Sequence, residues 1–179
     1  MLGAPLDVFM VRKLGLPRYQ ELAIGAIASG GVRVLNEALI RTAGVSQADI
    51  EAVTAAEERE LNRRLRRYRG DEPLPEVAGR TVILIDDGLA TGSTMQAAVT
   101  ALRQERPAAI VVAVPIAPPE TCDAFRGLVD DVVCAVTPEP FYGVGLWYED
   151  FSQTTDEEVH ELLERSRERF HGSAAGGIP

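Results

Sequence analysis

Lysine is almost absent from this sequence of 179 residues. Lys13 is the only lysine among 18 basic residues, so the other 17 are arginines. In a chain that uses arginine almost throughout, the retained lysine has two interpretations. It is an ordinary surface residue, or it marks a position that needs a compact, strongly hydrated positive charge, as phosphate sites do.

Cysteine and histidine are scarce as well, with two of each. Two cysteines are too few for a disulfide framework, and together with the histidines they show no recognisable metal-ligand spacing. Free cysteines are among the most buried residue types in proteins. We therefore expect Cys122 and Cys134 to be core residues.

Long hydrophobic runs are also missing. The longest candidate, residues 108–117, is interrupted by Pro115, whereas a membrane-spanning helix needs about 20 apolar residues. The N-terminus has neither the basic region nor the hydrophobic stretch of a secretory signal. We expect no membrane association and a cytoplasmic location.

The composition is that of a globular protein, with 46% hydrophobic and 25% charged residues. The length suits one domain, which we place at residues 1–171, followed by a flexible tail at 172–179 that is rich in small residues. The net charge of −9 argues against a surface that coats nucleic acid. We expect no nucleic-acid partner.

The first part of the chain predicts a strand at residues 6–12 and then a loop. Two apolar segments, 23–28 and 32–35, flank a Ser-Gly-Gly turn and predict a hairpin. A long helix is expected over residues 46–69, because Ser46-x-x-Asp49 is a capping pattern that precedes apolar residues at helical spacing. The arginine cluster at the end of this helix complements the helix dipole and predicts a solvated helix end.

Strands and helices alternate in the next part of the chain. The pattern predicts strands at 81–85, 109–114 and 131–136. It also predicts a helix at 93–105 and a helix that starts at Pro118 or Pro119 and is stopped by Gly127, and together these elements form a parallel α/β sheet. The continuous apolar run at 81–85 is typical of a strand that is covered on both faces.

An aromatic loop follows Pro138 and leads into a last helix. This helix is predicted to begin at the capping pattern Thr155-x-x-Glu158. The residues that we expect to point inward from it are Val159, Leu162, Leu163 and Phe170.

The segment VILIDDGLATGST, residues 82–94, is the most informative one. It runs from an apolar strand through two acids into a turn that is rich in glycine and hydroxyl groups and opens a helix. Helix N-termini present free N–H groups to anions, and ligands of α/β sheets bind at the carboxyl ends of strands. The turn therefore predicts a phosphate site, and the carboxylates of Asp86 and Asp87 predict contacts to the hydroxyls of a ribose and a nearby metal ion.

Other phosphate and catalytic motifs do not fit this segment. A Walker A loop needs lysine before the hydroxyl residue, but Gly92 is followed directly by Ser93. Neither the dinucleotide fingerprint G-x-G-x-x-G nor the nucleophile elbow G-x-S-x-G is present. The remaining alternative is a capped strand-to-helix turn with two surface acids.

The segment resembles the 5-phosphoribosyl pyrophosphate (PRPP) motif of type I phosphoribosyltransferases. Further segments resemble a bacterial branch of that family, so that the resemblance covers nearly the whole chain: LGAPLDVFMVRKLG, ELAIGAIASGGVRVLN and PEPFYGVGLWYEDFSQTTDEEV. The resemblance implies a Rossmann-like parallel sheet flanked by helices, with a small C-terminal hood at about residues 137–171. It also implies that the protein binds PRPP with Mg²⁺ and transfers the phosphoribosyl group to a small nitrogenous acceptor with release of pyrophosphate.

The resemblance assigns roles to residues of this chain. Asp86 and Asp87 would bind the ribose hydroxyls near Mg²⁺, and Arg12 and Lys13, at the end of the first strand, would meet the pyrophosphate. The residues that would bind the 5-phosphate are Ala90, Thr91, Gly92, Ser93 and Thr94. The aromatic residues of the hood, of which we expect about half to be core residues and the others to stack on the acceptor, are Phe141, Tyr142, Trp147 and Tyr148.

The sequence departs from the family at two places. Position 90 is alanine, where the hypoxanthine-guanine branch has an aspartate, and no general base is readable. The first strand of the family, with its pyrophosphate-binding turn, precedes the segment LGAPLDV and has no counterpart in this sequence, a difference of roughly forty residues. We expect the resulting gap to be closed by pairing of residues 6–12 with 81–86, or to be covered by another chain in a homo-oligomer.

Two other functions stay open at this point. The same fold also serves non-catalytic modules that sense PRPP or nucleotides. The predicted phosphate-binding turn at residues 90–94 would also suit another phosphosugar function.

Overall fold

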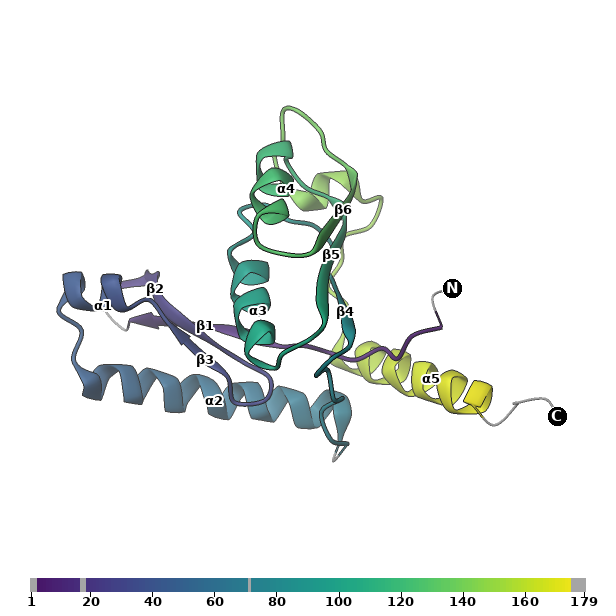
Figure 1. The fold of residues 1–179 in the computed structure, drawn as a ribbon, viewed down its shortest axis with the longest axis horizontal. Coiled ribbons are helices and arrows are strands. Elements are labelled where there is room, and N and C mark those ends of the chain that lie inside the picture. Colours follow the sequence, from purple (N-terminus) through teal and green to yellow (C-terminus); the bar gives the residue numbers. More distant parts are fainter. Residues whose placement is uncertain (1–2, 17–18, 71, 175–179) are drawn as a thin grey trace.

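The computed structural model describes residues 3–16, 19–70 and 72–174, which form two separate three-stranded sheets (Figure 1). The first sheet is antiparallel, in the order β1-β2-β3, and the second is parallel, in the order β4-β5-β6. Figure 1 shows α3 between the two sheets and α2 along the side of the first. The α/β fold and the parallel sheet flanked by helices are confirmed.

The antiparallel sheet contains β1 (Val11–Leu16), β2 (Tyr19–Ala28) and β3 (Arg33–Leu35). The predicted hairpin is confirmed, with Gly30 and Gly31 at its turn in left-handed conformations, φ 88° and 78°. The strand expected at residues 6–12 is wrong in position. β2 ends at Ala28 opposite Val11, so the β1–β2 ladder does not extend back to residues 3–10.

Two helices follow this sheet, α1 (Glu37–Ala43) and α2 (Gln47–Arg69). The predicted cap of α2 is confirmed, because the Ser46 side chain accepts a hydrogen bond from the backbone N–H of Asp49 at 3.1 Å. The helix packs on the hairpin, and the side chains that form this core are Leu14, Ile24, Ile27, Ile40, Ile50 and Leu61. No helix in the described ranges is long and apolar enough to cross a membrane.

The arginine-rich end of α2 is only partly solvated, contrary to expectation. Arg67 pairs with Asp156 and Glu157 at the start of the last helix. Arg69 is buried, where it pairs with Asp7 and donates to the carbonyl of Pro73 at 2.6 Å. Helical spacing turns Arg69 inward, and the segment before β1 supplies its carboxylate.

The parallel sheet contains β4 (Thr81–Ile85), β5 (Ala109–Ile116) and β6 (Asp131–Val136), as predicted. The helices α3 (Ser93–Gln104) and α4 (Pro119–Arg126) connect these strands. Both helices contribute to the core cluster that covers one face of the sheet, with Met95, Leu102 and Phe125 among its buried members. This packing fixes the starting points of α3 and α4 at the same edge of the sheet.

The other face of the parallel sheet is largely uncovered in the described part of the chain. Three apolar residues that alternate onto this face, Ile83, Ile85 and Val133, are 38–66% exposed. The expectation that residues 81–85 are covered on both faces is therefore wrong. The predicted pairing with residues 6–12 is also wrong, because β1 pairs with β2 and not with β4. Coverage by another chain stays a prediction.

The chain after β6 forms an irregular segment, the 3₁₀ helix η1 (Val144–Trp147) and helix α5 (Asp156–Ala174). The predicted Thr155–Glu158 cap is confirmed, because Glu158 accepts from the Thr155 N–H at 2.7 Å and Thr155 accepts from the Glu158 N–H at 3.2 Å. Leu163 is buried, but Leu162 and Phe170 are half exposed, so their predicted inward orientation is wrong. The reason is that α5 packs mainly against α2, which covers one side of the helix.

The boundary of the predicted tail also differs. Helix α5 continues to Ala174, so the tail predicted at 172–179 begins as helix. Residues 175–179 lie outside the described residues.

The two cysteines form a disulfide between α4 and β6, a bridge that was not expected from the sequence. Both belong to the core of the parallel sheet, as expected, with Cys134 only partly buried. Their Cα atoms lie 6.6 Å apart, and Cys122 is buried. The low cysteine count excluded a disulfide framework but not a single bridge. The packing of α4 on the sheet brings the two side chains together.

The buried arginine gives a first prediction. Replacing Arg69 by Met should lower the free energy of unfolding by about 3 kcal/mol, because it leaves the Asp7 carboxylate without its partner. Urea unfolding followed by circular dichroism measures the change. The matched variant Arg66→Met, at an exposed position of the same helix, should stay within about 0.5 kcal/mol of wild type. Equal effects of the two variants would contradict the structural role of Arg69.

The disulfide gives a second prediction. Unfolded protein without reductant should show no reactive thiol in a titration with Ellman's reagent, and reduction should release both. The bridge joins residues 12 positions apart, and closing a loop of this size stabilises a fold by about 3 kcal/mol. The double variant Cys122→Ser/Cys134→Ser should lose stability by about that amount. Two reactive thiols in the unreduced protein would show that the bridge is absent.

Candidate functional site

The candidate site lies on the loop of residues 86–92, between the end of β4 and the start of α3. The loop is anchored to the parallel sheet by Leu89. This residue is buried, and its N–H donates to the carbonyl of Ile116, the last residue of β5, at a distance of 3.0 Å. The carboxyl ends of β4, β5 and β6 share this edge, which is where parallel α/β sheets bind ligands. Residues on either side of Leu89 are therefore presented at the surface of the sheet edge.

The start of α3 is open to an anion. Gly92 is its N-cap in a left-handed conformation, φ 68°, and no side chain caps the helix. The Thr91 and Ser93 hydroxyls lie 3.3 Å apart and are exposed. An uncapped helix start combines free N–H groups with the positive end of the helix dipole. The structure thus brings the predicted residues 90–94 together as a cradle of donors.

Two glycines of the loop are required by close packing. A Cβ atom on Gly88 would lie 2.7 Å from the Val144 side chain of the C-terminal segment. A Cβ atom on Gly92 would lie 2.5 Å from the ring of Phe125 on α4. The loop is therefore pressed between α4 on one side and the segment around η1 on the other.

The acid pair, Asp86 and Asp87, forms the start of this loop. The Asp86 carboxylate accepts a hydrogen bond from the N–H of Asp87 at 3.0 Å. Removal of water by the surrounding protein raises the pKa of Asp86, the Asp87 N–H opposes this effect, and the neighbouring Asp87 charge adds to it. Both side chains lie in exposed positions, so a ligand can reach their carboxylate oxygens.

The two residues predicted to bind pyrophosphate, Arg12 and Lys13, have different partners in the structure. Lys13 donates from Nζ to the Ser93 hydroxyl at 2.7 Å, so the only lysine of the chain reaches the cradle. Arg12 forms an ion pair with Glu57 of α2. Both lie inside β1, not at its end as predicted, and neighbouring side chains of a strand point to opposite faces. The structure therefore brings only Lys13 to the cradle.

A cavity of about 440 Å³ adjoins the cradle. Ala90 and Thr91 belong to its wall, together with side chains from the start of α4 and from the segment after β6. The other lining residues are Pro118, Glu120, Pro138, Glu139, Pro140, Phe141, Tyr142 and Gly143. The cavity thus joins the predicted phosphate cradle to part of the predicted hood.

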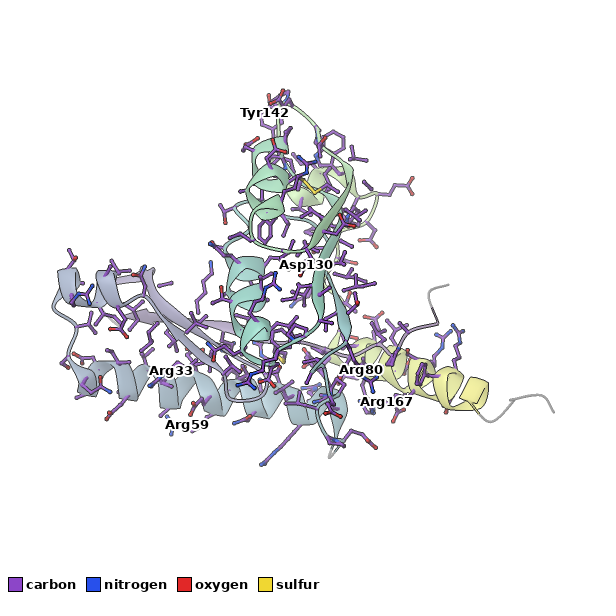
Figure 2. All side chains as sticks on the ribbon, in the orientation of Figure 1. Arg33, Arg59, Arg80, Asp130, Tyr142 and Arg167 are labelled. Atoms are coloured by element: carbon purple, nitrogen blue, oxygen red, sulfur yellow. A yellow bond between two sulfur atoms is a disulfide. The ribbon has the colours of Figure 1, made fainter. Side chains whose placement is uncertain are left out.

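The four predicted aromatic residues divide between two places. Phe141 and Tyr142 line the cavity, and Figure 2 shows Tyr142 at the tip of the molecule. Tyr148 instead donates its hydroxyl to the Asp87 carbonyl at 2.6 Å, and its ring lies 5.1 Å from that of Phe151. Trp147 is 49% exposed. None of the four is buried, so the expectation that about half are core residues is wrong.

Sequence reasoning missed the contribution of α4. The Thr121 hydroxyl donates to the Ala90 carbonyl at 2.9 Å, and Glu120 lines the cavity. The signal was available, because α4 follows β5 directly and its first turn must lie at the same sheet edge as the loop.

No cluster of three or more metal-ligating side chains occurs within residues 3–16, 19–70 and 72–174. Asp86 and Asp87 are a pair of carboxylates, which suits Mg²⁺ only when substrate phosphates and water complete its coordination. The site fits a metal that arrives with a phosphorylated ligand.

The similarity of this chain to known proteins extends beyond the residues of the site. The phosphoribosyl transferase domain family matches residues 11–144. A protein of Mycobacterium tuberculosis strain H37Rv that carries the name of a phosphoribosyl transferase, Rv0571c, is 43% identical over 177 residues, which is 99% of this chain. The counterpart in strain CDC 1551, with the same kind of name, shows the same identity and coverage. The chain spans 40% of the length of these relatives.

A solved structure is also similar. The protein TT1426 from Thermus thermophilus has a TM-score of 0.80 and 40% sequence identity, with 92% of this chain and 77% of that chain covered. The family match includes β1, the whole parallel sheet and the loop with the acid pair. Motif, fold and relatives agree: the chain belongs to the phosphoribosyl transferase family.

Proposed function

We propose that the protein binds PRPP with Mg²⁺ and transfers the 5-phosphoribosyl group to a small nitrogenous acceptor, releasing pyrophosphate. The observation that carries the proposal is that an uncapped helix start, an acid pair and the side chain of Lys13 meet around one loop. The 5-phosphate binds the N–H and hydroxyl groups of residues 90–94. The ribose hydroxyls donate to Asp86 and Asp87.

The cations differ in their proposed roles. Lys13 lies against Ser93 and supplies the positive charge for phosphate oxygens. Arg12 is held by Glu57, so it reaches the pyrophosphate only if that ion pair opens. Of the two basic residues assigned to the pyrophosphate, Lys13 is the one that we propose to contact the ligand directly.

The reaction breaks the bond between C1 of the ribose and the pyrophosphate oxygen, and the electron pair of that bond leaves with pyrophosphate. A nitrogen lone pair of the acceptor forms the new bond to C1, and the proton that this nitrogen carries passes to water or to the leaving pyrophosphate. Positive charge develops on the ribose in between, and carboxylates that bind the ribose hydroxyls would stabilise it. Binding both reactants beside one rigid loop supplies the orientation.

The proposed metal is bound mainly by the ligand. Asp86 and Asp87 offer carboxylate oxygens for Mg²⁺ or for its water molecules, and the remaining ligands come from the substrate. When bound, the ion neutralises charge on the phosphate oxygens.

The cavity beside the cradle is the proposed acceptor site. Phe141 and Tyr142 offer aromatic faces for a planar ring. The charged residues in its wall are Glu120 and Glu139, and no basic side chain of the described residues lines it. Two carboxylates repel an acidic acceptor and accept hydrogen bonds from amino groups. We therefore propose an acceptor that carries no carboxylate.

A non-catalytic module that senses PRPP or nucleotides is the second candidate. It is favoured by the engagement of Arg12 with Glu57, which leaves Lys13 as the cation that contacts the described cradle. Pyrophosphate release over a panel of bases distinguishes the two functions, because a sensor binds PRPP without releasing pyrophosphate.

The acid pair gives the third prediction. The variant Asp86→Asn/Asp87→Asn should bind PRPP in the presence of Mg²⁺ more weakly by about 2 to 4 kcal/mol, because hydrogen bonds to charged acceptors are lost. Isothermal titration calorimetry measures the affinity. Unchanged affinity would refute the proposed ribose contacts.

A matched control is available at the opposite end of the sheet. Asp130 and Asp131 are also adjacent, and Figure 2 shows Asp130 at the other end of β6 from Tyr142. The variant Asp130→Asn/Asp131→Asn should lose some stability, because Asp130 accepts from the Ile110 N–H at 2.7 Å. Its affinity for PRPP should equal that of wild type.

The acceptor cavity gives the fourth prediction. Adenosine 5′-monophosphate should bind at least about tenfold more tightly than orotidine 5′-monophosphate, because the orotidine ring carries a carboxylate. The variant Glu120→Gln/Glu139→Gln should remove most of this preference, whereas Glu149→Gln, outside the cavity wall, should retain it. Calorimetry with both nucleotides tests the idea, and equal wild-type affinities would contradict it.

A further inference from the structure

We propose that Thr121 and Tyr148 are positioning residues that aim the backbone N–H groups of the 86–92 loop at the ligand. The proposal rests on the proposed function, because the ligand is the phosphoribosyl group. It concerns two side chains outside the PRPP motif, one from α4 and one from the segment after η1. Each donates a hydroxyl hydrogen bond to a carbonyl of the loop, to Ala90 at 2.9 Å and to Asp87 at 2.6 Å.

The geometry of the peptide bond links these contacts to the ligand site. In a trans peptide unit, the carbonyl and the following N–H point in opposite directions. Thr121 holds the Ala90 carbonyl toward α4, which turns the Thr91 N–H away from α4. Tyr148 likewise holds the Asp87 carbonyl toward its own segment and turns the Gly88 N–H the other way.

The remaining contacts of the loop leave these two peptide units dependent on the hydroxyls. Between the acid pair and α3, one loop N–H is bound to the sheet, that of Leu89 on the Ile116 carbonyl. Neither the Gly88 N–H nor the Thr91 N–H has a hydrogen-bond partner within residues 3–16, 19–70 and 72–174. Thr121 and Tyr148 therefore supply the hydrogen bonds that fix the orientation of the peptide units after Asp87 and after Ala90.

The packing around the loop supports a positioning role. Phe125 and the Thr121 methyl group approach Gly92 so closely that an added Cβ atom would lie 2.5 and 3.2 Å from them. Val144 approaches Gly88 in the same way. The elements that supply the hydroxyls therefore touch the loop directly, so a small change in one hydrogen bond is transmitted to the N–H groups and not absorbed by a gap.

Conservative variants test the proposal. Thr121→Val keeps the side-chain shape and removes the hydroxyl, and it should weaken the binding of ribose 5-phosphate about fivefold. Thr121→Ser restores the hydroxyl and should bind as wild type. Tyr148→Phe should weaken binding by a similar factor, and it keeps the test independent of α4 if Thr121→Val does not fold. Calorimetry gives the affinities, and thermal unfolding checks the fold.

Two control variants remove comparable hydrogen bonds elsewhere. Thr100→Val loses a hydroxyl bond to the Gln96 carbonyl on α3, 2.8 Å long, and Tyr68→Phe loses the bond to Asp156. Neither should change the affinity for ribose 5-phosphate. In ¹⁵N–¹H spectra of the free protein, Thr121→Val should shift the Thr91 amide signal, whereas Thr100→Val should leave it unchanged.

The outcomes separate the two proposals. If wild type does not bind ribose 5-phosphate, the proposed function is wrong and the positioning roles with it. If wild type binds but Thr121→Val and Tyr148→Phe bind equally well, only the positioning roles are overturned. A loss of affinity in Thr121→Val that Thr121→Ser does not restore also overturns the role of the Thr121 hydroxyl.

Discussion

The burial of Leu89 is the constraint on which the site depends. This side chain is 3% exposed in the core beneath the sheet edge, and its N–H is bound to the last residue of β5. Because one residue in the middle of the loop is fixed in this way, the acid pair before it and the hydroxyl residues after it are held on the same exposed edge. The apolar core thus determines where the polar groups stand.

β1 connects this site to the rest of the molecule. Its alternating side chains place Arg12 on Glu57 of α2 and Lys13 on Ser93 at the start of α3. One strand therefore links the antiparallel sheet to the long helix and to the cradle. The fold brings the lysine to its position over 80 residues of sequence separation.

The sequence was most informative where local chemistry decides the structure. The caps at Ser46 and Thr155, the glycine turn of the hairpin and the loop after β4 all follow from short-range hydrogen bonding and backbone geometry, and the structure confirms them. The cradle at residues 90–94 belongs to the same class, since an uncapped helix start is a local feature. Features that depend on distant partners were not predictable. The position of β1 is decided by where β2 ends, and the burial of Arg69 depends on Asp7, 62 residues away. The disulfide and the bond from Thr121 to Ala90 both follow from the packing of α4, which spacing along the chain does not reveal.

The scarcity of lysine makes the cradle chemically distinct from the rest of the chain. Apart from the amino terminus, Lys13 carries the only primary amine in the chain, and that amine lies against Ser93 at the start of α3. Amine-acylating reagents therefore modify a single side chain besides the amino terminus, and it lies where the phosphate is proposed to bind. The extent of acylation at Lys13, read by peptide mass spectrometry, measures how far a bound anion shields its amine.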